Sequence, residues 1–128
     1  MKKTLAASSK SKKNSSKFVT LYRFANSSPL QINLFKELYK KDLHYPLTNF
    51  MSTTLDKAAG QGMARFSNLL LMILVPASMA SAFDLSSLAT FPDEREVLLP
   101  PNISFKITDL DMSSKIAQIK LEFVDYAI

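Results

Sequence analysis

Short runs of alternating or continuous apolar residues recur along the chain, and they predict a domain rich in strands. The run from Phe18 to Phe24 is rich in β-branched and aromatic residues. The run from Ile116 to Val124 alternates polar and apolar residues with period two, as in a strand with one face in water. Further strands are predicted at residues 49–53, 69–75, 96–99 and 103–108.

Two segments show helical features instead. From Pro29 to Lys41, leucines recur at helical spacing among polar residues. The segment from Asp56 to Phe66 predicts a short helix interrupted by Gly60 and Gly62, and Pro46 is placed in a loop between the helical and strand segments. Strands mostly in the second half, combined with a few short helices, predict an α+β fold.

The most apolar stretch of the chain is LLLMILV, from Leu69 to Val75. It is closed by Pro76 and is much shorter than the roughly 20 apolar residues that a membrane-spanning helix needs. A strand buried on both faces accounts for it better, and no membrane span is predicted.

Length and charge change this picture at the N-terminus. The 128 residues, 47% of them hydrophobic, suit one domain with a sizeable core. The net charge of +5 comes from the first 17 residues, which hold six lysines and no acid, while the rest carries ten basic and 11 acidic residues. We expect residues 1–17 to form a disordered tail and residues 18–128 one folded domain. We therefore expect no basic nucleic-acid-binding face on the folded part, and any contact with nucleic acid would be a weak one made by the tail.

The cysteine and histidine content and the N-terminal residues restrict which cellular compartments and which metal sites are compatible with this chain. The chain has no cysteine, which excludes disulfides and thiolate metal sites, and His44 is its one histidine, so no metal site is expected. The apolar stretch after Lys2 and Lys3 is too short for a secretory leader. These features fit a cytoplasmic protein or a delivered effector, and they do not decide the localisation.

Candidate chemistry first appears in TFPDEREVLLPP, which begins at Thr90. In an extended strand, Glu94 and Glu96 would project from one face with Cα atoms about 6.5 Å apart, while Arg95 would point away. Two like charges on one face suit a cationic partner or a cation that develops during a reaction, such as an oxocarbenium ion. Without other signals, the pair would be an ordinary solvated strand edge.

Three motifs in a fixed order give this pair a context. FPDEREVLLPPNISFKI resembles the C-terminal block of the arginine-specific mono-ADP-ribosyltransferases, in which a Glu-x-Glu pair leads into Val-Leu-hydrophobic-Pro. FVTLYRF supplies the Tyr-Arg of that family as Tyr22 and Arg23. FMSTTLDKAA is similar to its aromatic and Ser-Thr-Ser element, with Ser52, Thr53 and Thr54. Arg23, Ser52 and Glu96 thus follow the family's Arg-Ser-Glu order.

The resemblance implies a fold and an activity. The fold would be two packed, mainly antiparallel β-sheets that form an NAD cleft, with few short helices and a reduced N-terminal helical lobe. The activity would be cleavage of the nicotinamide–ribose bond of NAD, which is a substrate, and transfer of ADP-ribose to an arginine of a target protein. Hydrolysis of NAD would be a side activity, and no metal would be needed.

The resemblance also implies roles for individual residues. Arg23 would hold the dinucleotide, since a guanidinium matches phosphate oxygens, and Ser52 would position Glu96. Glu96 would bind the nicotinamide ribose and stabilise its cationic form, and Glu94 would engage the acceptor guanidinium. Phe91 would contact the target protein, or would only set the entry angle of the strand together with Pro92. The remaining motif residues expected to contact NAD are Tyr22, Thr53 and Thr54.

Several departures from the family pattern keep other functions open. Phe24 stands where the family usually has glycine, Thr54 replaces the last serine, and a lysine-rich tail stands in the place of the helical lobe. A second hypothesis is therefore a catalytically degenerate module that binds NAD or a protein partner without turnover. A third is a structural protein that its tail tethers to nucleic acid or acidic lipid.

Overall fold

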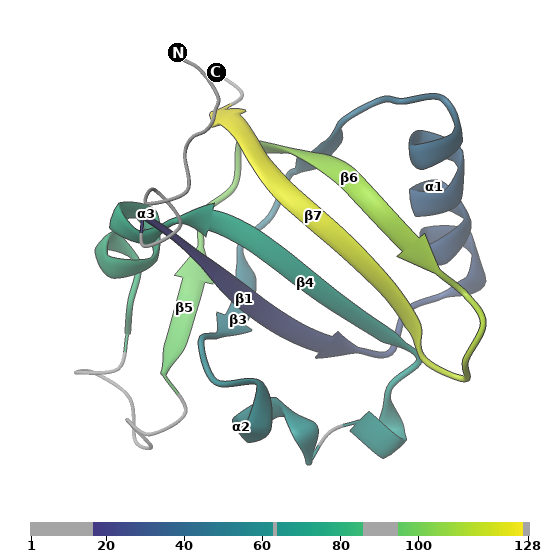
Figure 1. Cartoon of the computed structure of the whole chain (residues 1–128), viewed down its shortest axis with the longest axis horizontal. Coiled ribbons are helices and arrows are strands. Elements are labelled where there is room, and N and C mark those ends of the chain that lie inside the picture. The colour runs from purple at the N-terminus through teal and green to yellow at the C-terminus, as the bar shows by residue number, and fades with distance from the viewer. Residues whose placement is uncertain (1–16, 63, 86–94, 127–128) are drawn as a thin grey trace.

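The computed structural model describes residues 17–62, 64–85 and 95–126, and these residues form a mixed α+β domain (Figure 1). Its strands are β1 (Phe18–Ala25), β2 (Tyr45–Leu47), β3 (Met51–Thr54), β4 (Leu69–Pro76), β5 (Glu96–Leu99), β6 (Ile103–Asp111) and β7 (Ala117–Tyr126). Its helices are α1 (Pro29–Lys40), α2 (Lys57–Gln61) and α3 (Ala77–Ala82), with a 3₁₀ turn at Ala64–Phe66. The predicted α+β class is confirmed. The expectation of a disordered tail falls almost wholly on residues 1–16, outside the described ranges.

Hydrogen bonds link the strands of the described residues into one curled sheet in the order β2-β6-β7-β4-β1-β3-β5. Every pairing is antiparallel except that of β4 with β7. β1 pairs with β4 along its whole length, but it meets β3 only at Tyr22 and Thr54. The sheet therefore divides at this junction into a larger part and a smaller part made of β3 and β5. This division corresponds to the two packed, mainly antiparallel sheets that the family resemblance implies.

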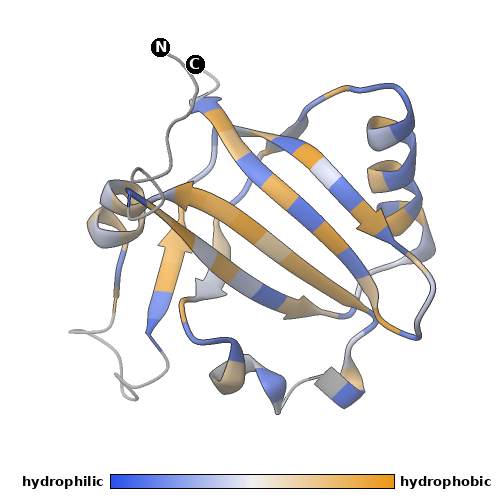
Figure 2. Cartoon of the chain, viewed as in Figure 1, coloured by the Kyte–Doolittle hydropathy of each residue, from blue (hydrophilic) through white to orange (hydrophobic). Residues whose placement is uncertain are grey.

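One hydrophobic core joins the two parts of the sheet. Figure 2 shows β4 as apolar along most of its length and β7 as alternating, and the wet face predicted for β7 is confirmed. Burial of β4 on both faces is confirmed only at Leu69–Leu71, because Met72 and Leu74 are partly exposed. Ile73 of β4 and Ile119 and Leu121 of β7 are fully buried or nearly so. Val97 and Leu99 of β5 belong to the same buried cluster, so the smaller part packs against the larger one.

Helix α1 covers one side of this core beside β6 (Figure 1). It begins where the Ser28 side chain accepts a hydrogen bond from the Gln31 backbone N–H at 3.1 Å, and Pro29 occupies the first turn, where its missing N–H costs no hydrogen bond. Phe35 is the buried anchor of the helix, and its ring contacts Tyr45 with centroids 4.7 Å apart. Helix α1 therefore fixes the position of β2.

Two elements differ from the sequence-based expectation. The loop assigned to Pro46 is instead strand β2, at the edge of the sheet, where Pro46 pairs with Ser104. An edge strand tolerates proline because one row of its backbone groups needs no partner. Helix α3 follows Pro76 and consists of small residues without a clear apolar period, so the pattern gave no signal for it. None of the helices in the described ranges is long and apolar enough to cross a membrane.

Candidate active site

The pairing of β3 with β5 brings Ser52 and Glu96 together. Thr54 lies opposite Glu96 and Ser52 lies opposite Leu98, so Ser52 and Glu96 are diagonal neighbours on one face. The Ser52 hydroxyl donates a hydrogen bond of 2.9 Å to Glu96 Oε2. This bond restricts the carboxylate to one orientation at the start of its strand.

Arg23 completes a contact chain across three strands. Its Nη1 donates to the backbone carbonyl oxygen of Ser52 at 3.0 Å. Arg23 belongs to β1, at the junction where the larger part of the sheet meets β3. A guanidinium and a carboxylate therefore lie on either side of Ser52 without an ion pair between them. The guanidinium can bind phosphate oxygens with its remaining donors, and the carboxylate can stabilise a developing positive charge.

Thr53 and Thr54 have other partners. Thr53 is 4% exposed, and its hydroxyl donates to the Val97 carbonyl oxygen at 2.6 Å in the interior between β3 and β5. The Thr54 hydroxyl accepts the Asp56 backbone N–H at 3.0 Å, at the turn that enters α2. The structure thus does not bring the Thr53 hydroxyl to Arg23, Ser52 and Glu96, and its bond instead supports the register that places Ser52 diagonally opposite Glu96.

Tyr22 lies on the opposite face of β1 from Arg23, because neighbouring residues of a strand alternate between faces. Its ring lies 5.9 Å from the Lys57 ammonium and borders a separate depression that Met72 and Lys120 also line. Tyr22 also pairs with Thr54, the residue that lies opposite Glu96, and its contact with NAD stays a prediction.

The backbone at Arg95 departs from the extended strand that the sequence predicts. Arg95 has φ 52°, in the left-handed region that residues other than glycine rarely adopt. Its carbonyl oxygen accepts the Leu55 N–H at 3.1 Å, and β5 begins only at Glu96. The assumption of one extended face through residues 94–96 is therefore wrong at Arg95. Glu94 and Phe91 lie outside the described residues.

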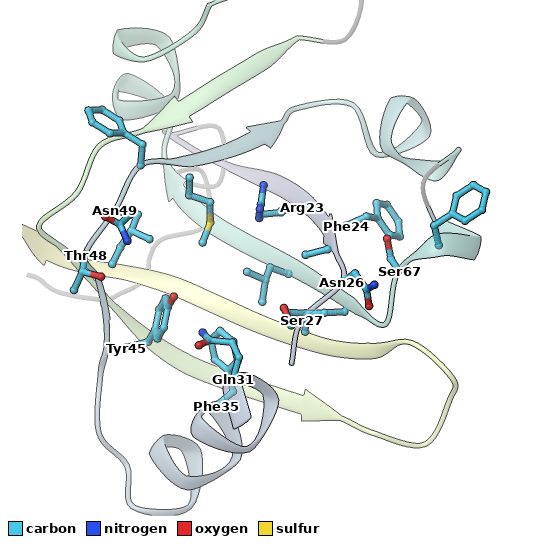
Figure 3. A pocket seen from close by; sticks show the side chains of 17 residues that line it. Arg23, Phe24, Asn26, Ser27, Gln31, Phe35, Tyr45, Thr48, Asn49 and Ser67 are labelled. Atoms are coloured by element: carbon cyan, nitrogen blue, oxygen red, sulfur yellow. The ribbon is translucent and has the colours of Figure 1, made fainter. Parts of the chain in front are cut away.

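A cavity of about 480 Å³ extends from Arg23 between β1, α1 and the β2–β3 connection (Figure 3). This volume lies in the range of small-molecule sites, about 300–1,000 Å³. Its polar side chains include Gln31, Tyr45 and Asn49, and its apolar wall includes Phe35. Ser52 and Glu96 do not line it. Arg23 is thus the residue that belongs both to the cavity and to the Ser52–Glu96 group.

Tyr45 and Gln31 are cavity residues that the sequence analysis did not single out. Burial raises the pKa of the Tyr45 hydroxyl, while a hydrogen bond from Gln31 and the positive charge of Arg23 act in the opposite direction. The available signal in the sequence was the spacing of Tyr45 and Leu47, two apolar residues that lie two positions apart, and such a short pattern does not identify a strand. Among the described residues, no three histidine, cysteine or acidic side chains are grouped to hold a metal ion.

Phe24 borders the same cavity on the side of α2 (Figure 3). A Cβ atom added to Gly60 would lie 2.9 Å from Cδ2 of the Phe24 ring, so the glycine makes room for this side chain. The ring therefore packs toward α2 and forms part of the cavity wall.

Comparisons with known proteins agree with this geometry. A protein-family model described as ADP-ribosyltransferase exoenzyme matches residues 3–127. The ADP-ribosyltransferase HopU1 of Pseudomonas syringae pv. Tomato DC3000 is similar in fold, with a TM-score of 0.68 and 23% identity over 84% of this chain and 45% of that one. No curated protein sequence matches the chain significantly.

Two further bacterial structures are also similar in fold. An ADP-ribosyltransferase from Clostridium botulinum has a TM-score of 0.60 and 18% identity, and the match covers 84% of this chain and 60% of that one. A protein from S. aureus, whose crystal structure was solved with NAD, has a TM-score of 0.56 and 18% identity over 85% and 63% of the two chains. The chain therefore spans about half to two thirds of the length of these neighbours. The expected ADP-ribosyltransferase fold is confirmed.

Proposed function

The chain belongs to the ADP-ribosyltransferase exoenzyme family, and from that premise we propose that it transfers ADP-ribose from NAD to an arginine of a target protein. The observation that carries this proposal is the contact chain from Arg23 through Ser52 to Glu96. It places a phosphate-binding guanidinium beside a carboxylate of fixed orientation, which are the two groups that the reaction needs at neighbouring positions.

Each step of the proposed reaction uses a group of this chain. Arg23 binds the pyrophosphate of NAD, and Glu96 accepts a hydrogen bond from the nicotinamide ribose. As the bond between ribose C1′ and the nicotinamide nitrogen breaks, nicotinamide leaves with the electron pair and Glu96 stabilises the positive charge that develops on the ribose. A guanidinium nitrogen of the acceptor then forms the new bond to C1′, and Glu94 takes its proton.

Arginine as the acceptor rests on the first position of the Glu-x-Glu motif. A glutamate at this position offers a full negative charge to a guanidinium, whereas a glutamine would offer only an amide. The motif is the support for this step, since Glu94 lies outside the described residues.

The Glu94→Gln variant separates cleavage from transfer. We expect nicotinamide release to fall less than labelling of a guanidine acceptor, because Glu94 acts on the acceptor while Glu96 acts on the ribose. Both activities are measured in one incubation with labelled NAD and a small guanidine compound. Equal loss of the two activities would contradict the role proposed for Glu94.

The Ser52→Ala variant tests whether the hydroxyl orients Glu96. A hydrogen bond to a charged group contributes about 1.5–3 kcal/mol, so we expect kcat for nicotinamide release to fall about tenfold or more with little change in KM for NAD. Ser52→Thr keeps a hydroxyl and should restore much of kcat. If the threonine variant is as slow as the alanine variant, the hydroxyl is not the feature that matters.

The overall proposal is tested by incubating the purified chain with labelled NAD, with and without a guanidine acceptor. Release of nicotinamide together with acceptor labelling supports the transferase. A second candidate is a module that binds NAD or a protein without turnover. Phe24 in the cavity wall favours this candidate, and binding of NAD without any release would establish it.

A further inference from the structure

The outer face of the sheet, which points away from the core, has an apolar centre. Figure 1 shows β4, β7 and β6 side by side. On β4 the residues that alternate with the buried Leu71 and Ile73 are Met72 and Leu74, and both are partly exposed although β4 is the central strand. A shallow depression of about 310 Å³ lies beside them. An uncovered apolar centre bordered by polar groups is typical of an interaction surface.

Two neighbouring rows of side chains cross this face from β4 through β7 to β6, and each row has one apolar and two charged members. The first row is Met72, Lys120 and Asp109, and the second row is Leu74, Glu122 and Lys106. On β7 and on β6, the charge in one row is opposite to the charge in the other. All four charged residues are exposed, and none makes an ion pair within the part of the chain that the structure describes. The charges therefore form a two-by-two checkerboard beside the apolar pair.

This pattern is complementary to itself. In a symmetric dimer the same patch of both copies meets, and a two-fold axis that runs across the strands between the rows places the first row of one copy over the second row of the other. The apolar pairs would then meet, and Lys120 would face Glu122 at two symmetric contacts. The same rotation pairs the opposite charges of β6. A partner with charges of only one sign would instead meet repulsion at half of the charged positions.

We propose that the chain forms a symmetric dimer through this outer face, so that a second copy covers Met72 and Leu74. Strands of the two copies are nearly aligned, as in packed sheets about 10 Å apart, a gap that lysine and glutamate side chains can bridge. Arg23 pairs with Leu71 and so points to the other side of the sheet. The dimer therefore leaves Arg23 uncovered, and its formation does not depend on the proposed function.

The size of the face sets the strength of the dimer. β1 and β4 are eight residues long and form this face together with β7 and β6. At about 3.3 Å per residue and about 4.8 Å between strands, the face offers roughly 500 Å² from each copy. Standard interfaces bury about 800 Å² from each partner, so we expect weak association with a dissociation constant on the order of 10 μM.

The test measures the sedimentation velocity of the purified chain at concentrations below and above this value. The parent chain should change from monomer to dimer as its concentration rises. Lys120→Glu alone and Glu122→Lys alone should each weaken association about tenfold or more, because each places like charges at both symmetric contacts. Lys36→Glu is the matched control and should leave association unchanged, because Lys36 is an exposed lysine of α1, which packs on the core side through Phe35.

An equal mixture of the two single variants tests the arrangement itself. In a mixed pair, the introduced carboxylate faces the introduced ammonium, and the native Glu122 faces the native Lys120. The mixture should therefore dimerise like the parent, and so should the double variant Lys120→Glu/Glu122→Lys, while thermal unfolding checks that every variant folds. A parent chain that stays monomeric well above the expected dissociation constant, a dimer that survives both single variants, or a mixture that stays monomeric would each overturn this inference and leave the proposed function untouched.

Discussion

Replacing Glu96 with glutamine is expected to abolish both nicotinamide release and ADP-ribose transfer while leaving the fold intact. Glutamine has nearly the same shape and can still accept the hydrogen bond from Ser52. It lacks the negative charge that stabilises the cationic ribose, and a group of this kind contributes about 10²- to 10³-fold to kcat. We therefore expect kcat to fall by at least this factor, with KM for NAD changed little.

The measurement compares kcat for nicotinamide release in Glu96→Gln and in the parent chain. Glu122→Gln is the matched control, because Glu122 is also a strand glutamate but is exposed on β7, and its removal should leave kcat unchanged. Thermal unfolding checks that both variants fold. A Glu96→Gln protein that unfolds normally and still releases nicotinamide at the parental rate would exclude Glu96 as the charge-stabilising residue.

The part of the site that the sequence predicted is the part built by short-range strand geometry. Ser52 and Glu96 each lie within a short strand whose motif identifies it, and the pairing of β3 with β5 brings them together once the strands exist. Period-two alternation also predicts that Tyr22 and Arg23 face opposite ways. Tyr22 pairs with Thr54, the residue opposite Glu96, so its expected contact with NAD stays a prediction.

Other features depended on contacts that local patterns do not report. Tyr45 belongs to β2, which becomes a strand through its pairing with β6 and through the packing of Phe35. This segment was predicted to be a loop because of Pro46, since proline usually marks a loop. The left-handed backbone conformation of Arg95 also could not be predicted from the sequence. Nothing in an arginine side chain favours a positive φ, so the surrounding structure must impose it.

Replacing Arg23 with lysine is expected to weaken NAD binding strongly although the positive charge is kept. A guanidinium has five donors in a planar fork, so Arg23 can hold the Ser52 carbonyl oxygen and a phosphate oxygen at once. A lysine ammonium is a compact point charge on a flexible stem and does not reproduce this geometry. Hydrogen bonds to charged groups contribute about 1.5–3 kcal/mol, so KM and Kd for NAD should rise about 10- to 100-fold.

The Arg23→Lys result also tests how the two parts of the sheet are joined. Arg23 spans the junction between β1 and β3, where Tyr22 and Thr54 form the only strand pair among the described residues. Loss of its bond to Ser52 should therefore lower kcat as well, since Ser52 orients Glu96. Arg65→Lys is the control, because Arg65 lies 4.8 Å from the Phe66 ring and does not line the cavity. Unchanged KM and kcat in Arg23→Lys would show that a positive charge at this position suffices, and the role proposed for the guanidinium fork would be wrong.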